Sequence, residues 1–422
     1  MEKFVIEGGE KLSGKVRING AKNSILPILA GSLLSSGKVK IEDVPHISDV
    51  KVMLGILECL GVKINWKGSS LELDAHSLST SEIPEELMCE MRSSIFLMGP
   101  LLGKLGKVKV SYPGGCAIGP RPIDLHLKGL ISMGVKVIEE NGYVCAEVGS
   151  LKGSTIHLDF PSVGATENLM MAAIYAEGST RLHNVAKEPE IVDLQNFLNK
   201  MGARVRGAGT DVITIDGVKS LEGAVHRLIP DRIIAGTMIA AAGITRGEVV
   251  IENVIPEHLE AVISKLREAG LEILEDTDSL LVRGGRIKGV NSVRTLPYPG
   301  FPTDMQPQIM ALLSNGEGLS VIKENVFEGR FSHIDELNKM GAQITVQGRS
   351  AIIKGIKRFT GANVKAPDLR AGAALVLAGL SAQGTTVVDE VHYIDRGYDK
   401  LELMLQKLGA NIKRVQAPVI NV

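Results

Sequence analysis

A sixfold internal repeat is the strongest constraint on what this 422-residue chain can fold into. In each copy, a run with helical periodicity ends in Leu-Gly, Met-Gly or Ala-Gly, and a β-like run follows. The glycines that end these runs lie 73, 68, 68, 71 and 68 residues apart. They are Gly61, Gly134, Gly202, Gly270, Gly341 and Gly409. Because a repeat of fixed period sets the architecture of a fold, we expect six copies of one supersecondary unit.

Each copy predicts a βαβαββ unit. A strand with an early glycine opens it, as in residues 12–19 and 221–229, and an Ala-rich helix follows, as in 23–36 or 368–382. The next strand leads to an amphipathic helix, such as 193–202, and a β-hairpin, such as 203–217, ends the unit. Single hydrophobic cores stop growing at about 250–300 residues, so six units predict an α/β protein with two domains of three units each.

The composition excludes several classes of protein. Lys and Arg number 47 against 48 Asp and Glu, the pI is about 6.8 and aromatic residues make up 4%, which argues against a nucleic-acid-binding surface. The N-terminus has no apolar region typical of a signal peptide. The longest uncharged apolar run, between Arg232 and Arg246, has 13 residues, short of the roughly 20 that a membrane span needs. We therefore expect a soluble, cytoplasmic protein with no membrane or nucleic-acid partner.

Cationic residues recur near the expected helix starts. Each opposes the helix dipole by a few tenths of a kcal/mol, and positions that break a local rule are often functional. Helix N-termini with added cations form sites for phosphates and carboxylates. For any single residue, the alternative is an ion pair with a neighbouring acid, such as Asp231 or Asp395. The seven cations are Lys22, Arg92, Arg121, Arg232, Arg330, Arg370 and Arg396.

The four cysteines form no CxxC pair and no metal-binding spacing with the nine histidines. Cys116 lies in the segment 112–125, whose three prolines and three glycines predict a loop. Its position five residues before Arg121 matches the exposed, electropositive setting of a reactive thiol. We interpret Cys59, in a predicted helix, and Cys145, in a predicted strand, as small buried apolar residues.

Two further segments combine a turn with a helix start. Asp304 follows three prolines in RTLPYPGFPTDMQ, where the alternative to a functional role is a helix N-cap by Thr303 or Asp304. Residues 162–164 in DFPSVGATENLMMAA could offer backbone N–H groups to an anion, and here the alternative is an ordinary cap by Thr166.

Together, the segments INGAKNSILPILAG, PGGCAIGPRPIDLHLKGL, SVGATENLMMAA, FPTDMQPQ, FEGRFSHIDEL, DLRAGAALVLAGL and HYIDRGYDKLE resemble the UDP-N-acetylglucosamine enolpyruvyl transferases. The resemblance covers essentially the whole chain. It implies two inside-out α/β barrel-like domains, each of three βαβαββ repeats, with the active site in the cleft between them. By this resemblance one domain spans 22–229 and the other joins 1–21 to 230–422.

The resemblance also implies the reaction, in which the enolpyruvyl group of phosphoenolpyruvate moves to the 3-hydroxyl of UDP-N-acetylglucosamine and phosphate is released. Cys116 is the expected acid that protonates the methylene group, and Asp304 is the expected base. Lys22, Arg121 and Arg396 are expected to hold the phosphate, and Arg330 and Arg370 to serve the carboxylate. Asn23 and Asp368 are expected to steady the tetrahedral intermediate. No metal or organic cofactor is implied, and no obligate protein partner is evident.

For the nucleotide sugar, the resemblance implies a site formed by Arg92, Arg121, Pro122, Ile123, Asp124, Leu125, Ser162, Val163, Gly164, Asp304 and Val326. One departure weakens a contact to the diphosphate, because Phe160 stands where some members of the family carry Lys. Two alternatives remain. The related shikimate-pathway enzyme lacks this cysteine loop, and a repeat scaffold that binds RNA ends fits poorly with the neutral pI and few aromatic residues.

Overall fold

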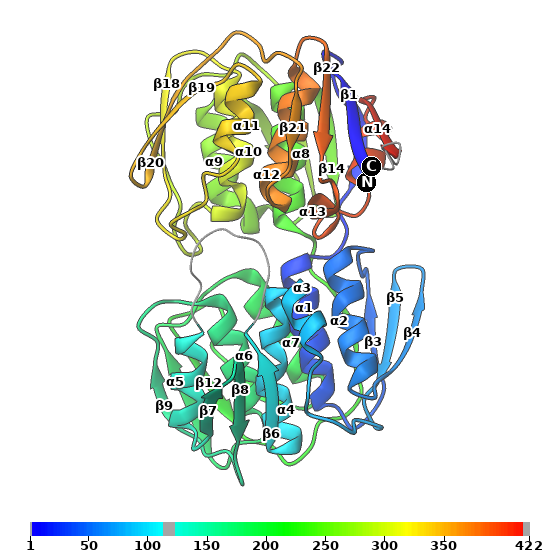
Figure 1. The fold of residues 1–422 in the computed structure, drawn as a ribbon, viewed down its shortest axis with the longest axis vertical. Helices are drawn as coiled ribbons and strands as arrows, with labels where there is room; N and C mark the ends of the chain where they lie inside the picture. The colour runs from blue at the N-terminus through cyan, green and yellow to red at the C-terminus, as the bar shows by residue number, and fades with distance from the viewer. Residues whose placement is uncertain (1, 113–122, 417–422) are drawn as a thin grey trace. The chain divides into compact units, whose positions relative to one another are not determined.

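The computed structural model describes residues 2–112 and 123–416, which form two compact units (Figure 1). The N-terminal unit comprises residues 20–112 and 123–229, and the C-terminal unit comprises residues 2–19 and 230–416. Each unit has its own apolar core. The core of the C-terminal unit includes Phe4 and Ile6 from the start of the chain, so within the described residues the chain passes between the units at 19–20 and at 229–230.

The C-terminal unit contains three four-stranded sheets, one for each repeat. Their strand orders are β15(Glu272–Glu275)-β16(Ser279–Arg283)-β14(Glu248–Glu252)-β2(Ser13–Arg17), β17(Val293–Arg294)-β18(Leu319–Lys323)-β20(Ser350–Lys354)-β19(Gln343–Gln347) and β21(Asn363–Lys365)-β22(Thr385–Asp389)-β1(Glu2–Glu7)-β23(Asn411–Gln416). In each sheet one neighbouring pair is parallel and the other pairs are antiparallel.

The first helix of each repeat forms the centre of this unit. These helices are α8(Arg232–Ile244), α10(Gln306–Ser314) and α12(Leu369–Ser381). They pack against one another, and every one of their residues is buried. Glycines permit this close approach, because a Cβ on Gly243 of α8 would lie 3.0 Å from Cδ1 of Leu312 in α10. The second helices are shorter and amphipathic, namely α9(Glu260–Glu268), α11(Ile334–Lys339) and α14(Leu401–Lys407), with the short α13(His392–Asp395) before α14.

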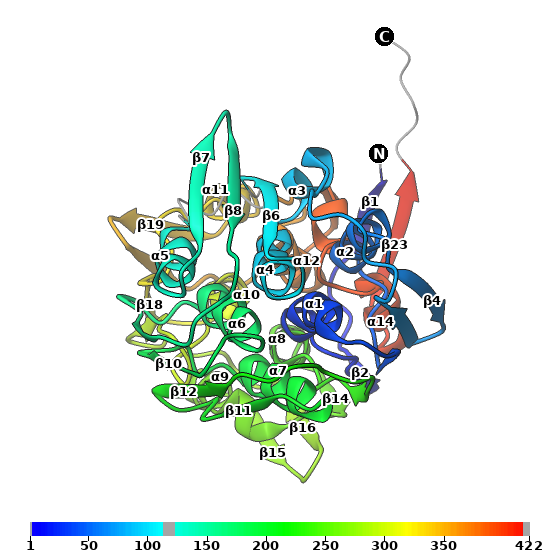
Figure 2. The same ribbon diagram turned by 90° about the horizontal axis from the view of Figure 1, so that it is seen from below.

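The N-terminal unit repeats the plan with one shortened sheet. Its strand orders are β13(Val225–Arg227)-β3(Val39–Glu42)-β5(Ser70–Asp74)-β4(Lys63–Lys67), β6(Lys107–Ser111)-β8(Tyr143–Glu147)-β7(Lys136–Glu140) and β11(Arg204–Arg206)-β12(Val212–Asp216)-β10(Ser179–His183)-β9(Thr155–His157). The inner helices are α1(Lys22–Gly31), α4(Met98–Leu105) and α6(Val163–Ala173), which Figure 2 shows among the strands. The remaining helices are α2(Ser48–Cys59), α3(Glu85–Glu90), α5(Asp124–Ser132) and α7(Pro189–Lys200).

All six repeat glycines adopt the left-handed backbone conformation, with φ between +90° and +106°. Each directly follows the C-cap residue of the second helix of its repeat, as Gly202 follows Met201 after α7. A side chain is strained at such a φ, whereas glycine reaches it at little cost. The sequence prediction that these glycines stop helices is therefore confirmed. The predicted hairpin at 203–217 is also confirmed, as β11 and β12.

Two strands belong to a different unit from the helix that follows them in sequence. The strand β2 precedes α1 of the N-terminal unit but pairs in parallel with β14 of the C-terminal unit. Likewise β13 precedes α8 but pairs with β3. Both strands lie where the chain passes from one unit to the other, so the strand and the helix that follows it belong to different units.

The six sheets of the described residues are open, with two edge strands each, and none closes into a barrel. The mixed α/β character that the sequence predicts is present throughout. The barrel-like closure is not confirmed by this topology.

Candidate functional site

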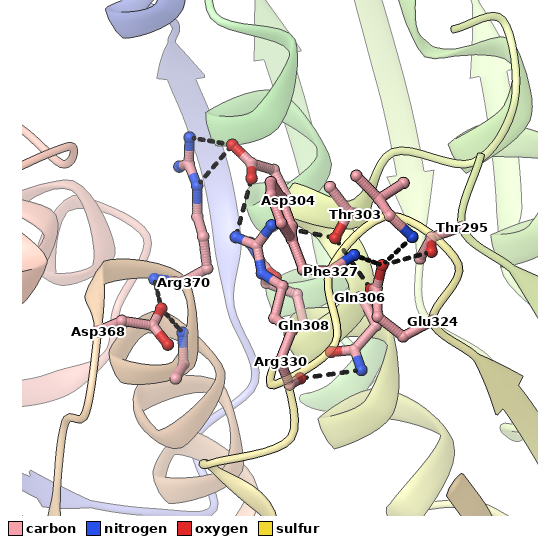
Figure 3. Close-up of polar contacts among 12 residues, drawn as sticks. Thr295, Thr303, Asp304, Gln306, Gln308, Glu324, Phe327, Arg330, Asp368 and Arg370 are labelled. Carbon is pink, nitrogen blue, oxygen red and sulfur yellow. Dashed lines mark hydrogen bonds and ion pairs between the residues drawn. The ribbon is translucent and has the colours of Figure 1, made fainter. Parts of the chain in front are cut away.

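The C-terminal unit places Asp304 between two arginines (Figure 3). Asp304 lies in the short 3₁₀-helix η4(Thr303–Met305), directly before α10, and Met305 packs against Gly236 of α8. Its Oδ2 accepts hydrogen bonds from Arg370 Nε at 3.2 Å and Nη2 at 3.0 Å. Its Oδ1 lies 2.8 Å from Arg330 Nη2. The carboxylate thus bridges two guanidinium groups. The N-cap residues of η4 and α10 are Pro302 and Met305, and neither makes a side-chain capping bond.

The two guanidinium groups that contact Asp304 are buried. The side chains of Arg330 and Arg370 are 3% and 1% exposed, whereas that of Asp304 is 26% exposed. Burial alone would lower the pKa of Arg370, but the neighbouring Asp304, Tyr398 and Asp231 outweigh it and raise that pKa above its usual value. Arg330 Nε is buried and has no hydrogen-bond partner among the described residues. A buried guanidinium N–H group without a partner is suited to receive an incoming anion.

Glu324 is a member of this cluster that the sequence analysis missed. It is 1% exposed, and its Oε1 accepts from Thr295 Oγ1 at 2.7 Å and from the backbone N–H of Val326 at 2.9 Å. Its Oε2 accepts from Thr303 Oγ1 at 2.9 Å, and Thr303 Oγ1 in turn accepts from Arg330 Nη1 at 3.0 Å. Glu324 therefore holds two segments in place. One contains Val326, which is expected to bind the nucleotide sugar, and the other is the turn that carries Asp304 (Figure 3).

Asp368 has a defined local role as the N-cap of α12. Its Oδ1 accepts from the backbone N–H groups of Arg370 at 2.8 Å and Ala371 at 3.0 Å. It thereby holds the first turn of the helix that carries Arg370. Arg396 is half-buried at the end of α13. Its neighbour Asp395 binds Arg414 Nη1 at 2.9 Å and Nη2 at 2.7 Å.

In the N-terminal unit, Lys22 and Asn23 begin α1. Lys22 is nearly buried, and its Nζ lies 2.9 Å from Oδ2 of the buried Asp49 on α2. Asn23 beside it is half-buried. A cation held at a helix N-terminus by a buried acid is a fixed charge, which lowers the cost of orienting it towards a ligand.

Ser162, Val163 and Gly164 form the start of α6, and all three are half-buried. Ser162 is the N-cap, with Oγ accepting from Ala165 N at 3.3 Å, whereas Thr166 Oγ1 donates to the carbonyl of Ser162 at 2.8 Å. The alternative of a cap by Thr166 is therefore wrong, and the helix starts at the predicted turn. The backbone N–H groups at this end remain the feature that can receive an anion.

His126, on α5, lies against this helix start and was missed by the sequence analysis. A Cβ on Gly164 would lie 3.4 Å from His126 Nε2. His126 Nδ1 is 2.9 Å from Asn168 Nδ2, an amide donor, so Nδ1 accepts and Nε2 carries the proton. Burial, and then the charge of Arg92, lower the pKa of His126 to about 4. A neutral imidazole therefore presents an N–H group beside Gly164, and Arg92 supplies a nearby positive charge.

The remaining predicted residues of the N-terminal unit lie at the start of α5. Ile123 is buried, Leu125 is half-buried and Asp124 is exposed. Phe160, which stands where the resemblance leads one to expect a Lys, is 45% exposed. Cys116, Arg121 and Pro122 lie outside the described residues.

The interpretation of the other cysteines needs correction. Cys59 is in a helix, as predicted, but it lies at the helix end and is exposed rather than buried. Cys145 is in strand β8, as predicted, and is only partly buried. Cys89 is exposed as well. Exposed thiols thus lie on the N-terminal unit in addition to the predicted reactive one.

No helix within 2–112 or 123–416 is both long and apolar enough to cross a membrane. In the same part of the chain, no three His, Cys, Asp or Glu side chains gather in a group that could hold a metal ion.

Comparisons with known proteins agree with the fold. Residues 6–416 match the family model described as EPSP synthase (3-phosphoshikimate 1-carboxyvinyltransferase). Among solved structures, the enolpyruvyl transferase NikO from Streptomyces tendae aligns with a TM-score of 0.89, 26% identity and coverage of 99% of both chains. EPSP synthase from Acinetobacter baumannii aligns with a TM-score of 0.76 and 20% identity, over 99% of this chain and 100% of that chain, which shows the shared fold. The fold and the matched family model define an enolpyruvyl transferase.

Curated relatives make the assignment narrower. UDP-N-acetylglucosamine 1-carboxyvinyltransferase 2 of Carboxydothermus hydrogenoformans is 55% identical over 418 residues, which cover 98% of this chain and 100% of the relative. UDP-N-acetylglucosamine 1-carboxyvinyltransferase 1 of Symbiobacterium thermophilum is 54% identical over 420 residues, or 98% of this chain and 95% of the relative. The chain belongs to the UDP-N-acetylglucosamine 1-carboxyvinyltransferase family.

Proposed function

We propose that this protein transfers the enolpyruvyl group of phosphoenolpyruvate to the 3-hydroxyl of UDP-N-acetylglucosamine and releases phosphate. The product serves as the first committed intermediate of peptidoglycan synthesis, in the cytoplasm. The names of relatives that are 54–55% identical over nearly the full chain support these substrates. The observation that carries the chemistry is the carboxylate of Asp304, held between Arg330 and Arg370.

The reaction proceeds by addition and elimination. The sugar oxygen attacks C2 of phosphoenolpyruvate while C3 gains a proton, which gives a tetrahedral ketal. Loss of a proton from C3 and cleavage of the bond from C2 to the phosphate oxygen then give the enol ether and inorganic phosphate. Chemistry of this kind requires an acid for C3 and a base for the sugar hydroxyl.

Asp304 is the base in this proposal. In the structure its oxygens are engaged by Arg330 and Arg370, so its carboxylate is not yet available to a hydroxyl. An anionic substrate that binds the same guanidinium groups replaces Asp304 as their partner. The oxygen that this exchange releases can then accept the proton of the attacking hydroxyl. Binding of phosphoenolpyruvate thereby makes Asp304 available as the base.

The remaining roles follow from residue chemistry. Cys116 is the proton donor to C3, because a thiol with an ordinary pKa of about 8.5 is a usable acid near neutral pH. Lys22, Arg121 and Arg396 bind the phosphate, and Arg330 and Arg370 bind the carboxylate. Asn23 and Asp368 steady the tetrahedral intermediate, Asp368 in part through its cap on the helix of Arg370.

The nucleotide sugar occupies a site formed by Arg92, residues 121–125, residues 162–164, Asp304 and Val326. The start of α6 and the Nε2–H of His126 supply donors for its diphosphate, in place of the cation that Phe160 does not provide. We place this site between two domains of three βαβαββ repeats each, 22–229 and 1–21 with 230–422, with helices inside and sheets outside in a barrel-like arrangement.

The test is release of inorganic phosphate from phosphoenolpyruvate, measured with UDP-N-acetylglucosamine, with shikimate 3-phosphate and with neither acceptor. We expect release only with the nucleotide sugar. Release with shikimate 3-phosphate alone would assign the chain to the other branch of the superfamily. Detection of an enolpyruvyl ether on the sugar by mass spectrometry checks that phosphate release reflects transfer rather than hydrolysis.

A further inference from the structure

Asp193 of α7 is only 3% exposed and connects three parts of the N-terminal unit. Its Oδ2 accepts the hydroxyl proton of Ser24 and the backbone N–H of Ile229, the latter at 3.3 Å. Its Oδ1 lies 3.0 Å from Nε2 of His226, which is 2% exposed. One buried carboxylate thus accepts three hydrogen bonds, from three separate segments of the chain.

Two of these segments are the places where the chain enters and leaves the unit. The unit begins at Gly20 and ends at Ile229. The N–H of Ala21 donates to the carbonyl of Ile229 at 2.8 Å, so the two ends are paired. Because the N–H of Ile229 and the hydroxyl of Ser24 share Oδ2 of Asp193, one carboxylate oxygen fixes both ends at once.

The first turn of α1 depends on this attachment. Its N-cap residue is Ala21, whose side chain makes no capping bond. The turn is instead held by side chains of other helices, on one side by Asp49 through Lys22 and on the other by Asp193 through Ser24. Lys22 and Asn23 immediately precede Ser24, so a shift of Ser24 displaces both.

His226 orients the carboxylate. Lys200 Nζ lies 3.3 Å from His226 Nδ1, and an ammonium can only donate, so Nδ1 accepts and Nε2–H points to Asp193. The ring also packs edge-on against Phe197, with 5.4 Å between centroids. These contacts fix which oxygen of Asp193 faces Ser24.

We infer that Asp193 is a positioning residue for phosphoenolpyruvate, acting through Ser24 on Lys22 and Asn23. The inference rests on the proposed function, which assigns these two residues to the phosphate and the intermediate. A displacement of about 1 Å at a binding group costs of the order of 10²-fold in rate. Loss of the Asp193–Ser24 contact should therefore impair the use of phosphoenolpyruvate and leave the nucleotide-sugar site, on α5 and α6, unaffected.

The experiment compares Asp193→Asn, Ser24→Ala and the double variant with wild type. We expect kcat/KM for phosphoenolpyruvate to fall roughly 10- to 100-fold in each single variant. The double variant should lose no more than the worse single variant, because both changes break the same contact. The Kd of UDP-N-acetylglucosamine for the free enzyme should stay within about twofold, which a general loss of structure would not allow. The matched control is Asp211→Asn, an exposed acid of the same unit that pairs with Lys187.

Ser24→Ala removes one hydroxyl and keeps the inference testable where Asp193→Asn does not fold. Kinetics within twofold of wild type in Ser24→Ala, additive losses, or an equal loss of nucleotide-sugar affinity would each overturn it. Lys22→Ala separates the inference from the proposed function. A normal use of phosphoenolpyruvate by Lys22→Ala would refute the assigned role of Lys22, whereas an impaired Lys22→Ala with an unimpaired Ser24→Ala would refute only the role of Asp193.

Discussion

Asp304 and Arg370 are joined through one oxygen, because Oδ2 accepts from both Nε and Nη2 of the guanidinium group, at 3.2 and 3.0 Å. The other oxygen of Asp304 pairs with Arg330 at 2.8 Å. A residue proposed as a general base is thus engaged at both oxygens before substrate binds. Its availability depends on the anion that competes for the two arginines.

Replacing Asp304 with Asn should separate binding from turnover. The amide keeps the shape but cannot take the proton, so kcat should fall by roughly 10²–10⁴, as is typical for the loss of a general base. The change also removes the negative charge between two buried guanidinium groups, so phosphoenolpyruvate should bind as well as before or more tightly. Titration calorimetry and steady-state kinetics measure the two effects. Asp335→Asn, on the solvent-facing start of α11, is the control, and a near-normal kcat for Asp304→Asn would contradict the assignment.

Arg370→Lys should not behave as a conservative change. Lysine keeps the charge but lacks the planar fork that gives two hydrogen bonds to one oxygen. Because a hydrogen bond to a charged group contributes about 1.5–3 kcal/mol, we expect kcat/KM for phosphoenolpyruvate to fall roughly 10- to 100-fold. Arg349→Lys, at an exposed ion pair with Glu328, is the matched control and should have little effect. Equal kinetics for the two variants would show that only the charge of Arg370 matters.

Among the four cysteines, Cys116 should be the one that reacts with an anionic electrophile. The phosphonate epoxide fosfomycin carries the charge of the phosphate that it would replace, so it should be directed to the substrate cations. The neutral reagent iodoacetamide should also label the exposed Cys59 and Cys89. Peptide mapping after each reagent makes the comparison, with Cys116→Ser as the control. Fosfomycin on Cys59 or Cys89 would remove the support for Cys116 as the acid.

Glu167→Gln should stabilise the protein at neutral and alkaline pH. Glu167, on α6, is fully buried with no hydrogen bond to either oxygen in the described residues, and burial, then Glu190 and Glu188, raise its pKa well above the ordinary value. The native state therefore binds this proton more tightly than the unfolded state, so the stability of the wild type falls as pH rises above about 4.3. Glutamine resembles the protonated acid and escapes this loss.

Thermal unfolding of Glu167→Gln at pH 8 and pH 4 measures this effect. The midpoint should rise at pH 8 by about 2–4 °C for each kcal/mol regained, and the difference should vanish near pH 4. The exposed Glu147→Gln serves as the control. If the wild type were as stable as Glu167→Gln at pH 8, ionisation of Glu167 would not destabilise the folded protein.

Two buried histidines predict a loss of stability in acid. Burial, chiefly, lowers the pKa of His126 and of His333 to about 4 each. The unfolded state binds these protons from about pH 6.5, so the native state loses stability as pH falls from 6.5 to about 4, by roughly 1.4 kcal/mol per pH unit for each group. Urea unfolding at pH 7 and pH 5 should show a smaller loss for His126→Gln than for wild type or the exposed His76→Gln. Equal losses of stability in all three proteins would show that His126 does not contribute to the acid sensitivity.

The repeat and its glycines could be predicted from the sequence because their cause is local. A residue with a φ near +100° after a helix must be glycine for steric reasons, and this requirement is independent of the surrounding fold. The same holds for helix starts such as Asp368, whose capping geometry involves residues no more than three positions away. These features persist in the sequence whichever unit a segment joins.

The pairing of β2 and β13 could not be predicted in this way. Each strand precedes a helix that belongs to the other unit, and only the path of the chain between two cores decides which neighbour its backbone bonds. Backbone hydrogen bonds between strands do not favour the segment that is nearest in sequence. The local pattern therefore predicts that a strand is present but not which strand it pairs with.

The repeat, the residue types of the candidate site and the family resemblance all follow from the order of the amino acids. Only the folded chain shows which charged side chains neutralise one another: Asp304 with Arg330 and Arg370, and Lys22 with Asp49. It also identified Glu324, His126 and Asp193, which look in sequence like ordinary polar positions. Their importance comes from burial, because a polar group removed from water must find partners, and those partners come from segments far apart along the chain.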